Sequence, residues 1–172
     1  GEYDRTLEFH QKSLDTYSRA LAPNHPYVAS AYNDIGLVHR DEGNHDEASG
    51  FFQKAMDIRQ NRLGSNHPDL ASSYNDMSQS LALAPKPDFV KAHEYNKKAE
   101  AIYKERSDEN FPGMSSVYFA RGIIDFAQEE YPKAKEALLK ALDIIENTPE
   151  PEPLMVARRH HELGRTERRW VT

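Results

Sequence analysis

A short phrase, Asn-His-Pro, occurs twice in this sequence and sets the length of a repeat. The copies lie at residues 24–26 and 66–68, a spacing of 42 residues. Between them lie two segments with helical spacing of apolar residues, joined at Glu42-Gly43-Asn44. A period of this size is typical of stacked helix-turn-helix units, each of which buries its apolar face against its neighbours. The repeat therefore predicts a helical solenoid.

The residues that follow the first copy recur along the chain. The first unit reads Tyr32-x-x-Ile35-Gly36-x-x-His39 and then Ala48-x-x-x-Phe52-x-x-Ala55. The matching positions of the next two units hold Tyr74, Met77, Ser78 and Ala92, and then Tyr118, Arg121, Gly122 and Ala134. Small residues are expected where the two helices of a unit approach to roughly 8–10 Å between axes.

These residues, together with the stretches 32–43 and 54–69, resemble the tetratricopeptide repeat in its kinesin light chain form. The spacing is longer than the usual tetratricopeptide length of roughly 34 residues. The likeness is strong over residues 1–106 and looser to residue 147. The resemblance implies an all-α fold, a right-handed α-solenoid of antiparallel helix pairs with 42-residue repeats.

We expect one repeat domain over residues 1–172, cut from a longer protein because the chain opens halfway through a repeat. Its parts are a half repeat at 1–22, repeats at about 24–65, 66–108 and 110–148, and a terminal half repeat at 154–172. The expected helices span 3–21, 26–42, 45–63, 68–83, 88–106, 113–128, 131–147 and 154–169. Phe111-Pro112 replaces the His-Pro start in the third pair, and the alternating prolines of 147–153 interrupt any helix there.

Local signals predict where several helices begin and end. Proline is favoured at the first helical position, so we interpret His25 and His67 as residues of helix starts and not as metal ligands. Gly43 suits the left-handed turn that ends a helix. Asn44, with Glu47 three residues later, predicts a capping box for the next helix.

Composition excludes several classes of protein. The chain is 38% hydrophobic and 29% charged, with no apolar run near the roughly 18–20 residues that span a membrane. It has no cysteine, which fits a reducing compartment, and we expect a cytoplasmic protein. Residues 154–172 hold five arginines and two glutamates, a charge of +3. Because the whole chain has a net charge of −6, residues 1–153 carry −9. Such an acidic body disfavours nucleic acid.

Catalytic chemistry lacks a candidate in this sequence. There is no glycine-rich phosphate loop, no nucleophile elbow and no cysteine nucleophile. The eight histidines lack the spacing that places two metal ligands on one helical face beside a carboxylate. We therefore expect neither an enzyme nor a metal or cofactor site.

The resemblance implies instead that one stripe of each first helix lines a concave groove. The stripe comprises Asn33, Leu37 and Arg40, then Asn75, Gln79 and Ala82, then Phe119, Ile123 and Phe126, and finally His161, Arg165 and Arg168. Kinesin light chains similarly place asparagines on this surface, and an asparagine amide can both donate to and accept from a peptide backbone. The matching ligand is an extended peptide with an apolar anchor beside acidic residues. The alternative is that the apolar members pack against a neighbouring helix and the arginines are solvated.

The expected function is protein recognition, as an adaptor or cargo-binding region like that of kinesin light chains. A second interpretation is a regulatory or scaffolding region of a larger protein whose signalling or catalytic domain lies elsewhere. The arginines of 158–169 could instead contact phosphates or an anionic membrane, but we expect neither partner because the acidic body would repel both. The unpaired helices at both ends predict head-to-tail self-association.

Overall fold

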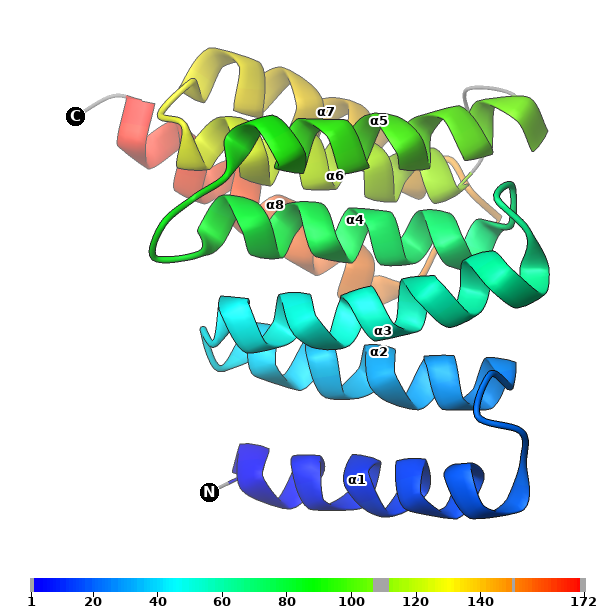
Figure 1. Ribbon diagram of the computed structural model, residues 1–172. Helices are drawn as coiled ribbons and strands as arrows, with labels where there is room; N and C mark the ends of the chain where they lie inside the picture. Colours follow the sequence, from blue (N-terminus) through cyan, green and yellow to red (C-terminus); the bar gives the residue numbers. More distant parts are fainter. Residues whose placement is uncertain (1, 107–111, 150, 171–172) are drawn as a thin grey trace.

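The computed structural model contains eight helices within the described residues, 2–106, 112–149 and 151–170 (Figure 1). They are α1 (Glu2–Ala20), α2 (Pro26–Asp41), α3 (His45–Leu63), α4 (Pro68–Leu83), α5 (Phe89–Arg106), α6 (Pro112–Ala127), α7 (Tyr131–Glu146) and α8 (Pro153–Trp170). Each predicted helix end within this part of the chain lies within one residue of the observed end. Phe111, the first residue of the predicted Phe111-Pro112 helix start, lies outside the described residues. The predicted repeat boundaries at residues 1, 108, 110 and 172 also lie outside them.

Three antiparallel helix pairs stack in order along the molecule, as α2 with α3, α4 with α5 and α6 with α7 (Figure 1). The helix α1 packs against α2, and α8 packs against α7. First helices of successive units also touch, because α4 contacts both α2 and α6, and α6 contacts α8. Figure 1 shows α8 crossing behind α4 and α6, on the side away from α5. The predicted all-α solenoid is confirmed.

Small residues let the paired helices approach closely, as predicted. A Cβ atom added at Gly36 would lie 2.6 Å from the Phe52 ring, and one at Gly122 would lie 2.7 Å from Leu138. The alanines Ala48, Ala92 and Ala134 of the second helices are fully buried. Any larger side chain at the two glycines would displace a core residue of the facing helix, which is costly in a close-packed interior.

Histidine and glycine mark the predicted helix boundaries. The Nδ1 atoms of His25 and His67 accept hydrogen bonds of 3.2 Å from the backbone N–H of Tyr27 and Asp69, so both rings cap a helix. Gly43 has a φ angle of 85°, the left-handed conformation expected for it.

The predicted capping box at Asn44 is wrong. The side chain of Asn44 makes no capping hydrogen bond to α3, although Asn44 is the cap residue. Its Nδ2 atom donates to Glu42 Oε2 at 3.2 Å instead. The bond to Glu42 uses the donor side of the Asn44 amide and orients it, and the local sequence pattern does not reveal this contact.

Candidate functional site

Two adjacent hollows lie on the inner side of the solenoid, between the first helices and α8. The smaller, of about 240 Å³, is bordered by residues of α2, α4, α6 and α8, and includes Leu37, Asn75 and Phe119. The larger, of about 310 Å³, includes Ile123, Phe126 and Arg165. Arg40 and Gln79 border both. Eight members of the predicted stripe therefore come together here, and we call the two hollows the inner groove.

Asn33 borders neither hollow, because its amide is held inside the protein. It is 8% exposed, and its Oδ1 atom accepts hydrogen bonds from Arg59 Nη1 at 3.1 Å and Ser73 Oγ at 3.3 Å. Its Nδ2 atom donates to Asp76 Oδ2 at 3.4 Å. Asn33 thus ties α2 to α3 and α4, a role that the repeat pattern alone does not distinguish from ligand binding.

Asp76 is a groove residue that sequence reasoning missed. Its Oδ1 atom accepts a hydrogen bond of 2.9 Å from Arg40 Nη1 while Oδ2 accepts from Asn33, so one carboxylate joins α4 to α2 twice. Burial raises the pKa of Asp76, although Arg40 and Asn33 act in the opposite direction. A signal existed, because the dipeptide Asn-Asp recurs at 33–34 and 75–76 in the same repeat position.

Asn75 differs from Asn33 because part of its amide has no partner. Asn75 is 3% exposed, and its Oδ1 atom accepts from Asn96 Nδ2 at 3.4 Å. Its buried Nδ2 atom has no hydrogen-bond partner among the described residues, and the residue borders the smaller hollow. A buried N–H group without a partner costs about 1–3 kcal/mol. A carbonyl oxygen supplied by a ligand would recover that free energy.

Gln79 holds its place by a local bond. Its Nε2 atom donates to the backbone carbonyl of Asn75 at 3.2 Å, one helical turn earlier. The side chain is buried and borders both hollows of the inner groove. Gln79 therefore supports the position of Asn75 while presenting its remaining polar atoms toward the groove.

The apolar part of the groove carries arginines stacked on aromatic rings. Phe119 is 4% exposed, and the guanidinium carbons of Arg158 and Arg159 each lie 5.1 Å from its ring centroid. The guanidinium carbon of Arg165 lies 4.7 Å from the Phe126 centroid. The sequence left open whether these aromatic residues line a groove or pack against a neighbouring helix. They do both, since arginines of α8 stack on the two rings and each ring also borders one of the hollows.

Arg159 is the most deeply held of these arginines. Its Nε atom donates to Ser115 Oγ at 2.8 Å, and its Nη1 atom donates to the backbone carbonyl of Met155 at 3.0 Å. Burial and the adjacent charge of Arg158 lower the pKa of Arg159 to about 10, so it is still a cation at neutral pH. Arg159 anchors α8 to α6 and also borders the smaller hollow, whereas Arg158 and Arg165 border the groove with exposed side chains.

The helix α8 presents a different face from the one expected. His161 and Arg168 are exposed and border neither hollow, while Met155, Arg158 and Glu162 do. The nearest atom to a Cβ added at Gly164 of α8 is Arg168 Nη1 at 3.7 Å, so no second helix presses on this glycine as Phe52 presses on Gly36. The spacing 155, 158, 162 and 165 is itself a helical stripe, and it would have identified the face that α8 turns inward.

Other predicted features receive no test from the structure. The apolar side chains Phe9 of α1 and Leu154 of α8 are exposed, and self-association through these ends stays a prediction. Among the described residues there is no group of three or more histidine, cysteine or acidic side chains placed to hold a metal ion. None of the described helices combines the length and the hydropathy needed to span a membrane.

Comparisons with known proteins agree with this architecture. A model of the tetratricopeptide repeat matches residues 1–61 and 27–105. Among solved structures, BtubC (BKLC) from P. vanneervenii superposes with a TM-score of 0.72 at 19% identity, over 98% of this chain and 66% of that protein. A kinesin light chain protein from Podosopora anserina with nearly identical TPR-like repeats superposes with a TM-score of 0.67 at 17% identity, over 98% of this chain and 79% of its own length.

These likenesses concern the fold. The chain spans about two thirds of BtubC, and a comparison with curated protein sequences gives no match. The kinesin-light-chain form of the repeat, expected from the sequence, is confirmed at the level of the architecture.

Proposed function

We propose, from the premise that this chain belongs to the tetratricopeptide repeat family, that its inner groove binds an extended segment of another protein. Repeats of this family mediate protein–protein interaction, and the finer assignment is a kinesin-light-chain-like adaptor or cargo-binding region. The observation that carries the proposal is the buried, unpartnered Nδ2 atom of Asn75 at the edge of the smaller hollow. Since no acceptor among the described residues bonds to it, a carbonyl oxygen of a ligand in the groove can accept this hydrogen bond.

The chemistry around Asn75 defines the segment that fits. Phe119 borders the same hollow and offers an apolar wall, which suits one apolar anchor side chain of the ligand. Arg158 and Arg165 stand at the exposed edge of the groove, where acidic residues of the ligand would meet them. The ligand is therefore an extended peptide that places a backbone carbonyl at Asn75, an apolar side chain near Phe119 and carboxylates toward α8. Grooves of this kind bind at roughly micromolar affinity, about −8 kcal/mol.

An array of synthetic peptides tests this chemistry directly. The probes are extended peptides with one central leucine or tryptophan flanked by aspartate and glutamate, and matched peptides in which lysine replaces the acidic residues. We expect the chain to retain acidic peptides and not the lysine set. If the chain retains peptides according to their total charge, whatever the central residue, the proposed apolar anchor near Phe119 would be contradicted.

Variants locate the binding in the groove. Fluorescence polarisation of the best array peptide should show a roughly tenfold weaker Kd for Asn75→Leu, because the amide donor is lost and 1.4 kcal/mol corresponds to tenfold. Arg165→Glu should weaken the same peptide by a similar factor. Arg62→Glu, an identical charge change at an exposed site on α3, is the matched control and should leave Kd unchanged. Equal affinity of all three variants would remove the groove from consideration.

A further inference from the structure

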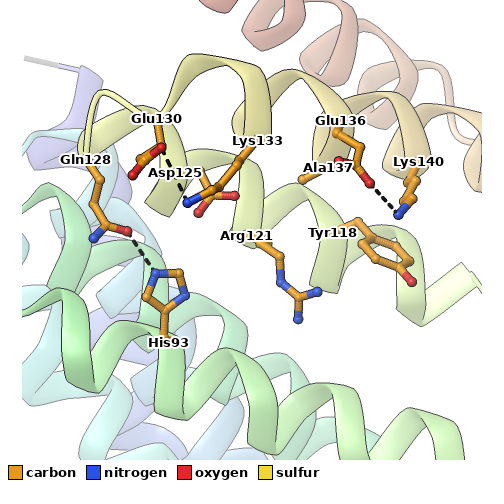
Figure 2. A pocket seen from close by; sticks show the side chains of 10 residues that line it. All are labelled: His93, Tyr118, Arg121, Asp125, Gln128, Glu130, Lys133, Glu136, Ala137 and Lys140. Carbon is orange, nitrogen blue, oxygen red and sulfur yellow. Dashed lines mark hydrogen bonds and ion pairs between the residues drawn. The ribbon is translucent and has the colours of Figure 1, made fainter.

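Apart from the two hollows of the inner groove, a further hollow of about 400 Å³ lies between α5, α6 and α7. No residue of α8 borders it. Figure 2 shows its walls, with His93 on α5 facing the ends of α6 and α7. His93 Nε2 and Gln128 Oε1 are 2.8 Å apart and close one end. We call this hollow the outer pocket. The proposed groove function does not use it.

The cations of the outer pocket already have carboxylate partners. Arg121 Nη2 lies 2.6 Å from Glu100 Oε2, just beyond the pocket border, and Lys133 Nζ lies 3.4 Å from Glu130 Oε2. Lys140 and Glu136 form a third pair at 2.8 Å. Three cations are thus matched by three carboxylates, and these groups leave no net positive charge for an anion.

Asp125 remains as the unmatched charge. It is 7% exposed, borders the outer pocket and has no hydrogen bond or ion pair among the described residues. Figure 2 shows its carboxylate beside the side chain of Lys133 in this view, and no dashed line joins Asp125 to another residue. Burial raises its pKa, while the nearby charges of His93, Arg121 and Lys133 act in the opposite direction and Glu130 adds to the rise. The carboxylate therefore opens onto the pocket without a direct partner among the described residues, so it is available to a cationic group that enters.

The matching positions of the other units show what packing alone requires. Leu81 occupies this position in the second unit and packs in the core, and His39 occupies it in the first, stacked on Phe51 with ring centroids 5.3 Å apart. Both fill their site. The third unit holds an aspartate there and leaves a hollow beside it, so its carboxylate faces a space that a cationic group can enter.

We propose that the outer pocket binds the guanidinium group of an arginine side chain from a partner protein, with Asp125 as its counter-ion. A guanidinium can donate two parallel hydrogen bonds to one carboxylate, which suits a single buried acid. Ala137 supplies an apolar wall against which the methylene stem can lie. The volume admits one or two side chains and excludes a folded element. The chain would then recognise partners on two faces, with acidic residues inside the solenoid and a basic residue outside it.

Amide NMR spectra of the whole chain, titrated with N-acetyl-L-arginine amide, test the pocket. We expect saturable shifts at Asp125, Gln128 and Lys133. N-acetyl-L-citrulline amide has nearly the same shape without the charge and should bind at least tenfold more weakly. N-acetyl-L-lysine amide should bind more weakly than the arginine probe, because its ammonium lacks the paired donors. Equal binding of the citrulline or lysine probe would overturn the proposal.

The variant Asp125→Asn keeps the shape of the side chain and removes its charge, so it should fold and lose at least tenfold in affinity for the arginine probe. Asp57→Asn, the same change at an exposed site on α3, is the control and should not alter it. Asp125→Asn should also leave acidic-peptide binding in the inner groove unchanged, so the two sites fail or succeed separately. Unchanged affinity of Asp125→Asn for the arginine probe, or shifts that never saturate, would refute the pocket.

Discussion

The junction of α2 with α4 and the junction of α6 with α8 are built from matching repeat positions. The first contains hydrogen-bonded polar side chains, and the second contains aromatic rings. In the first, Asn33 and Arg40 of α2 bond to Asp76 of α4, so polar side chains lock two units together. In the second, the matching positions hold Phe119 and Phe126, over which arginines of α8 stack.

This contrast between the two junctions shows that a repeat position determines where a side chain lies but not whether it forms a polar network or an aromatic contact. A network of complementary charges has one arrangement that satisfies every partner, so it holds its units rigidly. Exposed arginine side chains over aromatic rings have several arrangements of similar free energy and can turn toward a ligand. We therefore expect stability to depend most on the first junction and adaptable binding to depend most on the second.

Breaking the first junction should have the largest effect. Asp76→Ala removes the carboxylate that both Arg40 and Asn33 use, leaving the guanidinium of Arg40, whose side chain is 7% exposed, without its closest partner. Loss of one member of a buried ion pair predicts a decrease of about 3 kcal/mol in the free energy of unfolding. Urea unfolding followed by circular dichroism measures it. Asp57→Ala on the exposed side of α3 should change little, and a similar loss in both variants would contradict the contrast.

A conservative change at the second junction should cost less stability and more binding. Phe119→Leu keeps an apolar side chain of similar volume and should lower the free energy of unfolding by no more than about 1.5 kcal/mol. It removes the ring on which Arg158 and Arg159 stack, so the edge of the groove loses its order. Peptide affinity measured by fluorescence polarisation should fall several-fold. A variant that is strongly destabilised yet binds normally would reverse the roles assigned to the two junctions.

The same contrast extends to the outer side, where matching positions hold the apolar Leu81 and the acidic Asp125. Because the pKa of Asp125 is raised in the folded state, the folded protein holds this proton more tightly than the unfolded chain does. The contribution of Asp125 to stability is therefore most favourable below the unfolded pKa and is lost as pH rises through the folded pKa. Asp125→Asn should be more stable than the wild type at pH 7, and the difference should shrink toward pH 4.

Thermal unfolding at a series of pH values measures that difference. Asp57→Asn provides the matched control and should show no such trend. A gap between the wild type and Asp125→Asn that widens as pH falls would mean that Asp125 has a cationic partner within the folded chain.

The smallest effect on stability is expected at the exposed edge of the second junction. Arg165→Ala removes the contact with Phe126 and an ion pair of 3.0 Å with Glu162 on the same helix. Exposed contacts between a cation and an aromatic ring contribute about 0.5–1 kcal/mol. Differential scanning calorimetry should therefore show only a small decrease in Tm, comparable to that of Arg62→Ala. A large decrease would show that Arg165 is a structural residue like Arg40.

Much of this fold could be predicted because its signals are local. Pro26 and Pro68 begin helices, Gly43 adopts a left-handed turn, and Gly36 faces Phe52 where two helices must meet. Each of these requirements is satisfied within one unit of 42 residues. The groove was predictable in part, since eight of the twelve stripe residues border it, and Asn33, Ala82, His161 and Arg168 do not.

The sequence by itself determined the helices, their order and the register in which they stack, because backbone conformation and the period of apolar residues depend on near neighbours. Only the tertiary structure decided which polar atoms find partners. Asn33 and Asn75 hold the same repeat position. Within the described part of the chain, Asn33 is bonded through both amide atoms, whereas Asn75 Nδ2 has no partner, because Arg59 and Asp76 reach only Asn33. The identity of a partner depends on side chains from three or four helices converging at one point, and no single unit contains that information.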